Sequence, residues 1–274
     1  MLNIIKNSFC ICKNKLKQEI NFGNLPLINN YKKTINLTKY PVIVSQCEKC
    51  KLIQLKYSVR DKLLFPNSYP YLSGNSKEKV NNFESILKAI QKFSKKSNSK
   101  ILDIGSNDGS FLHVVKKKYS NLLGVEPTNS AKIAIRKGIK IIKKSLNLEL
   151  AKKIVKKYSK FDFIIATNIL AQTNNLDGIL KSIKFILNDK GLLIIEVQYL
   201  YDLIDQKGFD SFHPEHIQYY TLSSITKVLK NYNLYAFDAA RLSVHGGVLR
   251  VYVSSESKPY KKNMKRMLKM EMMK

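Results

Sequence analysis

The stretch from Phe212 to Tyr220 holds two of the four histidines in this sequence, and histidine can move a proton near neutral pH. It reads Phe-His-Pro-Glu-His-Ile-Gln-Tyr-Tyr, so that His213, Glu215 and His216 fall within four positions. Histidine titrates close to neutral pH and can act as a general base or acid. A single histidine more often serves a core or a surface, and that interpretation stays open here. We expect this segment to be a candidate catalytic site.

A glycine-containing turn follows an apolar run in the middle of the chain. The run at 101–104 leads into Gly105-Ser106-Asn107-Asp108-Gly109, and a helical pattern starts directly behind it. Glycines at the carboxyl end of a strand let the backbone turn tightly and approach a ligand. The next apolar run ends in Glu126-Pro127, where a carboxylate can accept both hydroxyl groups of a ribose. The spacing therefore predicts a nucleotide site.

The residues of this turn favour one class of nucleotide. A dinucleotide site would have a second glycine where Asn107 stands, because that glycine lets a pyrophosphate approach the helix. The carboxylate of Asp108 repels a pyrophosphate but suits a ligand with a cationic amine and a sulfonium, such as S-adenosylmethionine. Asp103 in the strand and Asn168 at the end of the fourth strand complete the expected cofactor site. Under the alternative interpretation, the glycines serve turn geometry alone.

Four cysteines form a second group with a chemical pattern. Cys10, Cys12, Cys47 and Cys50 all lie in the first 50 residues, and no cysteine follows. Cys47 and Cys50 have the spacing of a zinc knuckle, whereas Cys10 and Cys12 are one residue closer together than usual. We expect the four thiolates to hold one structural Zn²⁺ ion. The alternative is a set of ordinary free thiols, buried or on the surface.

The composition predicts a folded protein with a basic surface. The chain has 274 residues, 44% of them hydrophobic, and a formal net charge of +28 from 48 Lys+Arg against 20 Asp+Glu. Such a charge can indicate nucleic acid or a membrane surface. Only five of the basic residues are arginine and the lysines are spread over nearly every expected helix, so nucleic acid is not the expected partner. With no secretory signal and no run of ~20 apolar residues, we expect a cytoplasmic protein without a membrane span.

From residue 100 onward, apolar runs alternate with amphipathic stretches. We expect strands at 101–105, 122–126, 139–142, 161–167 and 191–197, separated by helices at about 110–119, 129–137, 147–158 and 176–187. A helix near 222–232 and strands at 234–242 and 248–254 follow. This order predicts an α/β fold with a Rossmann-like doubly wound sheet.

The chain divides into four expected parts. Residues 1–58 form a small zinc-binding domain, and residues 59–97 an aromatic loop followed by a helical connector. Residues 98–255 form the domain that binds S-adenosylmethionine. Residues 256–274 are a basic, Met-rich tail for which the sequence offers no packing partner.

Taken together and in order, the motifs resemble one family, the zinc-containing sugar C-methyltransferases. The matching segments are Pro26-Leu27-x-Asn29, Cys47-x-x-Cys50-x-Leu52-x-Gln54-Leu55, Tyr69-x-Tyr71-x-Ser73, Asp103 to Gly109, Gly124-Val125-Glu126-Pro127, Asn168-x-x-Ala171, Glu215-His216 and His245-Gly246-Gly247-x-Leu249-Arg250. Members of this family use S-adenosylmethionine to methylate a carbon next to the keto group of a nucleotide-linked deoxysugar. The resemblance implies a class I methyltransferase fold and a nucleotide-sugar substrate.

The resemblance also implies roles for particular residues. His216 would remove the proton α to the ketone, and the resulting enolate carbon would attack the sulfonium methyl. Glu215 would bind the sugar or orient His216, and Tyr71 would lie against the substrate or the sulfonium. The expected substrate-binding residues are Asn29, Tyr69, Tyr71, His245 and Arg250.

The sequence departs from the family's pattern at three places. Gln172 stands where the family has a histidine, and it can donate a hydrogen bond to an enolate oxygen. His213 and Pro214 replace a tyrosine and a histidine, so His213 could supply a titratable group. The family continues into a second lobe that helps to hold the nucleotide-sugar, and this chain ends at Lys274, where that lobe would start. A partner chain could supply the lobe.

Two other functions are alternatives to sugar C-methylation. An RNA methyltransferase would use the same cofactor and bind a phosphate backbone with the zinc module and lysines; steep salt dependence of binding would favour it. A shortened remnant would keep the cofactor site without turnover. Tyr69 and Tyr71, together with Glu215 and His216, favour a compact polar substrate over RNA.

Overall fold

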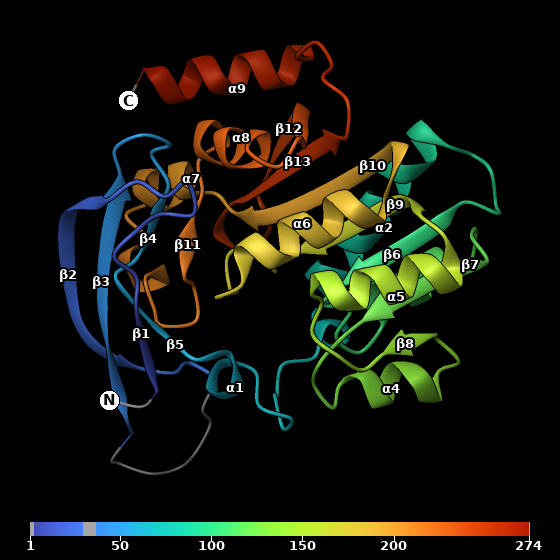
Figure 1. The fold of residues 1–274 in the computed structure, drawn as a ribbon, viewed down its shortest axis with the longest axis horizontal. Coiled ribbons are helices and arrows are strands. Elements are labelled where there is room, and N and C mark those ends of the chain that lie inside the picture. Colours follow the sequence, from blue (N-terminus) through green and yellow to red (C-terminus); the bar gives the residue numbers. More distant parts are fainter. Residues whose placement is uncertain (1–2, 30–36, 274) are drawn as a thin grey trace.

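A seven-stranded sheet forms the centre of the protein in the computed structural model, which describes residues 3–29 and 37–273. In order across the sheet, the strands are β12 (Tyr235–Leu242), β13 (Val248–Ser254), β10 (Leu187–Gln198), β9 (Phe161–Thr167), β6 (Lys100–Ile104), β7 (Asn121–Val125) and β8 (Ile141–Ile142) (Figure 1). The strands from β10 to β8 run parallel, whereas β13 pairs antiparallel with both β10 and β12. The predicted Rossmann-like α/β class is therefore confirmed, with a mostly parallel sheet.

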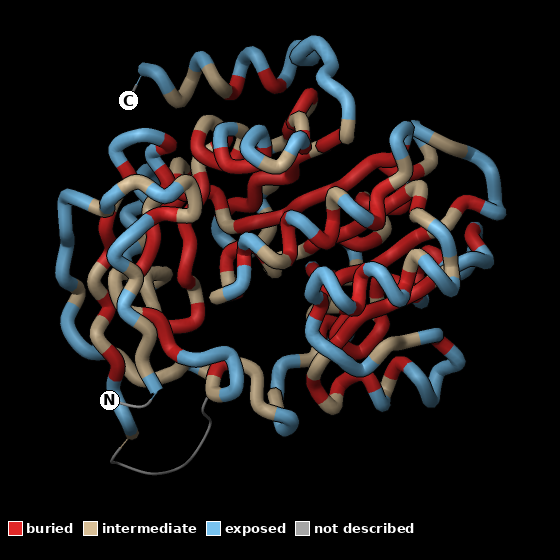
Figure 2. The backbone as a smooth tube through the Cα atoms, viewed as in Figure 1, coloured by how far each residue is buried: buried red, intermediate tan, exposed pale blue. Residues whose placement is uncertain are grey.

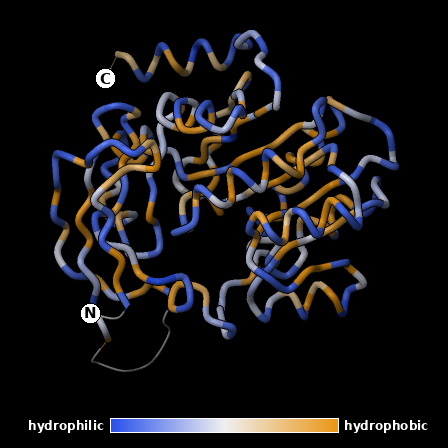
Figure 3. The backbone as a smooth tube through the Cα atoms, viewed as in Figure 1, coloured by the Kyte–Doolittle hydropathy of each residue, from blue (hydrophilic) through white to orange (hydrophobic). Residues whose placement is uncertain are grey.

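Helices cover both faces of this sheet. One face carries α2 (Lys77–Phe93), α3 (Ser110–Val115) and α4 (Ala131–Arg136), and the other carries α5 (Leu148–Tyr158), α6 (Leu176–Ile186) and α8 (Leu222–Lys230). The strands between them are buried along most of their length (Figure 2) and hydrophobic (Figure 3), as expected for parallel strands covered on both faces. Within the described part of the chain, no helix is both long and apolar enough to cross a bilayer.

The N-terminal region forms a second sheet, one strand of which comes from the C-terminal part of the chain. Its four antiparallel strands are, in order, β11 (Gln218–Tyr219), β4 (Ile53–Leu55), β3 (Lys39–Cys47) and β2 (Leu16–Pro26). A separate two-stranded pair joins β1 (Ile4–Lys6) to β5 (Tyr57–Val59). Because β11 lies at the end of the histidine segment, the N-terminal sheet includes residues from the C-terminal part of the chain.

Short helical pieces make the connections around the sheets. They are α1 (Asp61–Leu64), η1 (Ser73–Asn75), α7 (Leu200–Asp205), η2 (Phe209–Ser211) and η3 (Val244–Gly246). The aromatic loop lies between α1 and η1 and leads into α2, whose first turn is capped by Ser76. These connections bring the N-terminal half of the chain to the carboxyl ends of the central strands.

The C-terminal tail is a helix that packs on the domain, which differs from the expectation of a tail without a partner. Helix α9 (Lys262–Met272) lies over β12 and α8 (Figure 1), and its Met264 and Met267 are buried there. Glu271 accepts hydrogen bonds from the backbone N–H groups of Leu222 (2.5 Å) and Ser223 (2.9 Å) at the start of α8. A carboxylate at a helix N-terminus is stabilising, so the polar end of α9 is fixed as well as its apolar face.

Candidate active site

A cavity of about 600 Å³ opens at the carboxyl ends of β6, β7, β9 and β10. This is the edge at which open α/β sheets bind ligands, since the strand order reverses beside β6. The cavity gathers residues from stretches that lie far apart in the sequence. The predicted site residues that line it are Asn29, Tyr69, Tyr71, Gly105, Asn107, Glu126, Pro127, Asn168, Gln172, His213, Glu215 and His216.

Glu126 stands just past the end of β7 with its carboxylate on the cavity wall. It is 5% exposed, and Oε2 accepts a hydrogen bond from the backbone N–H of Asn107 at 3.0 Å. Oε1 accepts from the backbone N–H (2.8 Å) and the hydroxyl (2.6 Å) of Thr128. Each carboxylate oxygen has two lone pairs, so Oε2 retains capacity for a ligand hydroxyl. The protein thus holds this carboxylate in one orientation before any ligand binds.

The two residues of the glycine turn that line the cavity, Gly105 and Asn107, have left-handed backbone conformations. Gly105 has φ +70°, and a Cβ built there would lie 2.1 Å from Cδ1 of Ile169, which also lines the cavity. Asn107 has φ 50°, a conformation that asparagine tolerates better than most residues. Asn168, at the end of β9, has φ 61°. The left-handed conformations at these three positions therefore determine the path of the backbone around the cavity.

Asn107 ties the aromatic loop to the glycine turn. Its Oδ1 accepts a hydrogen bond from the backbone N–H of Ser73 at 2.9 Å, and its Nδ2 donates to the carbonyl of Tyr71 at 2.9 Å. Burial raises the pKa of Tyr71, whose ring lines the cavity. The side chain of Asn107 thus determines where the loop bearing Tyr71 lies.

Asp108 and Asp103, expected in the cofactor site, lie behind the wall of the cavity. Asp108 accepts hydrogen bonds from the N–H (3.2 Å) and hydroxyl (2.7 Å) of Ser110 and from the N–H of Gly74 (3.1 Å). It therefore fixes the start of α3 and the connector. Burial and then the charge of Glu126 raise the pKa of Asp103 well above its usual range. Ser106 and Gly109 also lie outside the cavity lining, and Gly109 packs against Ala134.

The histidine segment forms a compact cluster on the wall opposite the glycine turn. Nδ1 of His213 lies 3.0 Å from Oε2 of Glu215, and Oε1 of that carboxylate accepts from the backbone N–H of Asn29 at 3.2 Å. The rings of His213 and His216 are 4.2 Å apart between centroids, with 36° between their planes. Glu215 therefore contacts His213, whereas orienting His216 was one of the two roles that the resemblance implied for it.

His216 is held in its neutral form. Burial, reinforced by the neighbouring His213, lowers its pKa to about 3, although a backbone hydrogen bond at Ser211 acts in the opposite direction. Its Nδ1 is buried and has no hydrogen-bond partner in the described part of the chain. The neutral imidazole has a nitrogen lone pair that can accept a proton, and the lowered pKa means that it accepts one less readily than an ordinary histidine.

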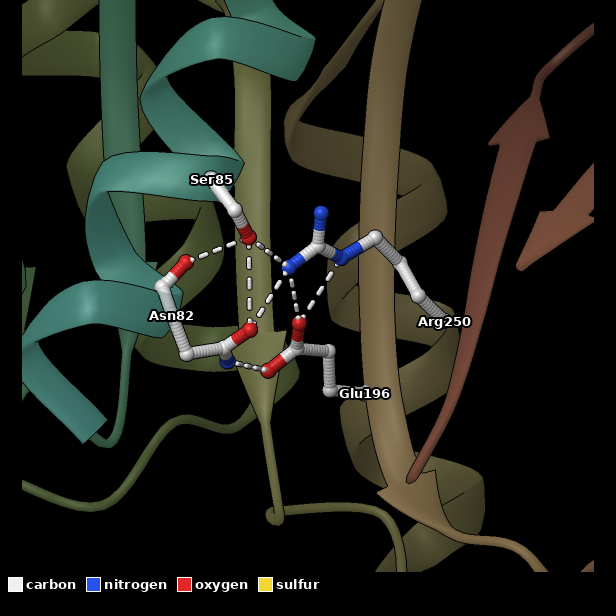
Figure 4. Close-up of polar contacts among 4 residues, drawn as sticks. All are labelled: Asn82, Ser85, Glu196 and Arg250. Carbon is white, nitrogen blue, oxygen red and sulfur yellow. Dashed lines mark hydrogen bonds and ion pairs between the residues drawn. The ribbon is translucent and has the colours of Figure 1, made fainter. Parts of the chain in front are cut away.

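Arg250, expected to bind substrate, is instead buried in a polar network (Figure 4) and does not line the cavity. Its Nη2 lies 2.7 Å from Oε1 of Glu196, and Nε donates to the same oxygen at 2.8 Å. Nη2 also donates to Oδ1 of Asn82 (2.9 Å) and to the hydroxyl of Ser85 (2.7 Å). The network links β13 and β10 to α2, because arginine can donate several hydrogen bonds at once. The side chain of His245 lies outside the described part of the structure.

Several residues that line the cavity were missed by the sequence analysis. Thr128 lies two positions after Glu126, and that proximity was an available signal. Lys79, in the first turn of α2, is 4% exposed and lines the cavity. In a chain so rich in lysine, no local pattern distinguishes it from the exposed ones. Burial was the missing information.

The four cysteines converge into one cluster in the N-terminal region, at the end of β3. The Sγ atoms of Cys10 and Cys50 are 3.4 Å apart, those of Cys12 and Cys47 3.4 Å, and all four lie within 4.8 Å of one another. Tetrahedral Zn²⁺ with Zn–S bonds of ~2.3 Å places its sulfurs ~3.8 Å apart, so the set fits this metal. Hydrogen bonding with Cys10 lowers the pKa of Cys50 to about 5, and burial raises that of Cys47.

A second cavity, of about 780 Å³, lies beside this cysteine cluster. Lysines supply much of its lining, among them Lys13, Lys49 and Lys181, and Asp177 is paired with Lys181 at 2.7 Å. It contains neither the glycine turn nor the histidine segment. We therefore place the candidate active site in the smaller cavity.

Comparisons with known proteins identify relatives of this chain. The curated C-methyltransferase NovU from Streptomyces niveus is 23% identical over 241 residues, which cover 86% of this chain and 57% of that protein. The chain thus spans little more than half the length of this relative.

Among solved structures, the fold is similar to that of magnesium protoporphyrin IX methyltransferase from Synechocystis PCC 6803 with bound SAH. The TM-score is 0.51 at 12% identity, covering 64% of this chain and 83% of that one. An S-adenosylmethionine-dependent methyltransferase from Clostridium acetobutylicum ATCC 824 gives a TM-score of 0.51 at 16% identity, covering 63% and 89%. A family model described as a methyltransferase domain matches residues 79–237, more than half of the chain. The protein therefore belongs to this methyltransferase family.

Proposed function

We propose that the protein is an S-adenosylmethionine-dependent C-methyltransferase whose acceptor is a keto-deoxysugar attached to a nucleotide. One observation carries the proposal: a single cavity brings the Glu126 carboxylate and the glycine turn together with His216 and Gln172. The first pair suits a nucleoside, and the second suits the formation of an enolate. The likeness to a C-methyltransferase supports this choice of chemistry.

The cavity fits S-adenosylmethionine by the chemistry of its lining. Glu126 would accept the ribose hydroxyls, and the backbone at Gly105 and Asn168 would lie along the amino-acid part. The ring of Tyr71 would face the sulfonium, because an aromatic face attracts a cation. When bound, the cofactor supplies an electrophilic methyl group.

The residues of the opposite wall would prepare the acceptor. His216 would take the proton from the carbon α to the ketone, which leaves the electron pair in the enolate. Gln172 would donate a hydrogen bond to the enolate oxygen. The α carbon then forms its bond to the transferred methyl, and S-adenosylhomocysteine is the leaving group. Glu215 would hold His213 and the Asn29 backbone in place, so that the acceptor meets a rigid wall.

The cysteine cluster would hold a structural Zn²⁺ ion. The cluster shares a core with Leu52 and Tyr220, which lie next to β4 and β11. A metal ion there would stabilise the N-terminal sheet, whose edge strand β11 lies at the end of the histidine segment. We assign the ion no part in the reaction.

The basic residues support a small acceptor over RNA. Among the described residues that line the cavity, Lys62 and Lys79 are the lysines, and no arginine accompanies them. An RNA substrate would require a row of cations at the mouth of the site. The nucleotide of the acceptor could be held by a partner chain, since the matched relative is much longer.

The cofactor is tested by calorimetric titration of the zinc-loaded protein with S-adenosylmethionine. We expect micromolar binding that Glu126→Gln weakens by about tenfold or more, as for lost hydrogen bonds to a charged group. Glu149→Gln is the matched control, because Glu149 is an exposed glutamate paired only with Lys153 in the same helix. No binding by a folded, zinc-loaded protein would overturn the proposal.

The acceptor is tested by incubation with nucleotide-linked keto-deoxysugars in deuterated water. We expect deuterium to enter the carbon α to the ketone and His216→Gln to abolish this exchange while cofactor binding persists. Cofactor binding without exchange or methylation would instead indicate a remnant without turnover. Methylation of RNA with steep salt dependence would favour the RNA alternative.

A further inference from the structure

Lys79 is a buried lysine whose side chain lines the candidate active-site cavity. It is 4% exposed, and it stands in the first turn of α2, where its backbone N–H is capped by Ser76. Its Nζ lies 5.7 Å from the centroid of the Phe83 ring. Lysines in this chain are otherwise mostly at the surface, so this position sets Lys79 apart.

No anion is paired with this ammonium in the described part of the chain: neither an ion pair within 4 Å nor a hydrogen bond joins Nζ to a carboxylate. Glu196 is the strongest nearby negative charge, but Oε1 is taken by Arg250 and Oε2 by Asn82 (Figure 4). Asp103 is the next charge in strength, and burial raises its own pKa well above the usual range. A buried cation without a partner is costly, and its pKa is lowered here by that burial.

The position of Lys79 relative to Glu126 fits a ligand that spans the cavity. Glu126 follows β7, whereas the charges that act on Lys79 lie on β10 (Glu196) and β6 (Asp103). Strands β6 and β9 separate β7 from β10 in the sheet. A nucleoside held at Glu126 therefore has room to extend over β6 and β9 toward Lys79.

We infer that Lys79 binds the carboxylate of the methionine part of S-adenosylmethionine. This assignment rests on the proposed function. The ligand's carboxylate would give the ammonium the partner that the protein does not supply. A charged hydrogen bond in a site of low polarity is strong, so Lys79 would contribute to cofactor affinity and selectivity.

The test compares S-adenosylmethionine with decarboxylated S-adenosylmethionine, which keeps the amine and the sulfonium, by calorimetric titration. The wild type is expected to bind the carboxylate-containing compound about tenfold or more tightly. Lys79→Met should remove this preference by weakening S-adenosylmethionine alone. Lys77→Met, the same change at an exposed position two residues earlier in α2, should leave both affinities unchanged.

The outcomes separate the two proposals. If the wild type binds S-adenosylmethionine but shows no preference for the carboxylate, or if Lys79→Met weakens both compounds equally, the assignment of Lys79 is wrong and the cofactor assignment stands. If the wild type binds neither compound, the proposed function itself is overturned. Thermal unfolding checks the fold of each variant, and a wild type without the preference overturns the assignment even if Lys79→Met does not fold.

Discussion

The side-chain oxygen of Asn107 accepts a hydrogen bond from the backbone N–H of Ser73, 34 residues earlier in the chain, at 2.9 Å. The same side chain donates to the carbonyl of Tyr71. One side-chain amide therefore joins the glycine turn to the loop that bears Tyr71. Movement of this loop and occupancy of the turn should be coupled.

The first prediction concerns this clamp. Asn107→Gly keeps the left-handed backbone accessible but removes both side-chain hydrogen bonds. Loss of about 1–1.5 kcal/mol of local stability should accelerate amide hydrogen exchange at Ser73 about tenfold. Asn233→Gly is the control, since Asn233 also has a positive φ but lies in an exposed turn. Unchanged exchange at Ser73 would show that the clamp does not hold the loop.

The second prediction concerns the buried pair of Arg250 and Glu196. Arg250→Met leaves Glu196 buried without its cation and should lower the free energy of unfolding by about 3–5 kcal/mol. The double variant Arg250→Met/Glu196→Gln should recover part of that loss, because no unpaired charge remains. Denaturation in urea measures both. If Arg250→Met changed acceptor KM and left stability intact, Arg250 would bind substrate as the sequence first indicated.

The third prediction is a pH dependence of stability that arises from His216. Its pKa is lowered to about 3 in the folded protein, so His216 takes up a proton on unfolding below its ordinary pKa of about 6.5. The free energy of unfolding should therefore fall as pH decreases from about 6.5 toward 3, by at most about 1.4 kcal/mol per pH unit from this group. His216→Gln should show a shallower slope between pH 7 and pH 5 in urea denaturation. The exposed His113 provides the matched variant, His113→Gln, and equal slopes for the two variants would contradict the prediction.

The fourth prediction concerns the cysteine cluster. Metal analysis should find one zinc ion per chain, and a thiol reagent should react with four cysteines only after a chelator removes the metal. Cys47→Ser should lower the zinc content and the thermal stability together. Four thiols that react at once in the untreated protein would indicate ordinary free cysteines.

The fifth prediction concerns the C-terminal helix. Glu271→Ala removes the acceptor of two backbone N–H groups at the start of α8 and should cost about 1–2 kcal/mol of unfolding free energy. Glu256→Ala, at an exposed position before α9, should have little effect. Equal losses for the two variants would show that α9 is held by Met264 and Met267 alone.

The central sheet could be predicted because its strands are uninterrupted apolar runs and its helices repeat at helical spacing. Strand β8 was expected over 139–142 but pairs only at Ile141 and Ile142, because it is the edge strand. Glu126 could be placed beside the glycine turn, since strand order fixes the relative position of the two. These features depend on local pattern and topology.

Other features depend on contacts that local pattern does not encode. From its place in the strand, Arg250 could bind either a ligand or Glu196. The packing of α2, whose Asn82 and Ser85 accept hydrogen bonds from Arg250, selects the pairing with Glu196. Asp108 follows a turn that suits a cofactor, yet Ser110 and Gly74 take its oxygens. Helix α9 packs on a surface that β12 and α8 form only after they have folded. The roles of the residues around the cavity stay predictions.

The shared strand β11 has a consequence for how the protein is made. Gln54 in β4 pairs with Gln218, about 160 residues later in the chain. At roughly 5–20 residues per second of synthesis, the first sheet waits about 8–30 s for its edge strand. The cysteines leave the ribosome long before the sheet beside them is complete. Early binding of a metal ion would protect these thiols from oxidation during that interval. The first role of the cluster would then be to keep the cysteines of the nascent chain reduced.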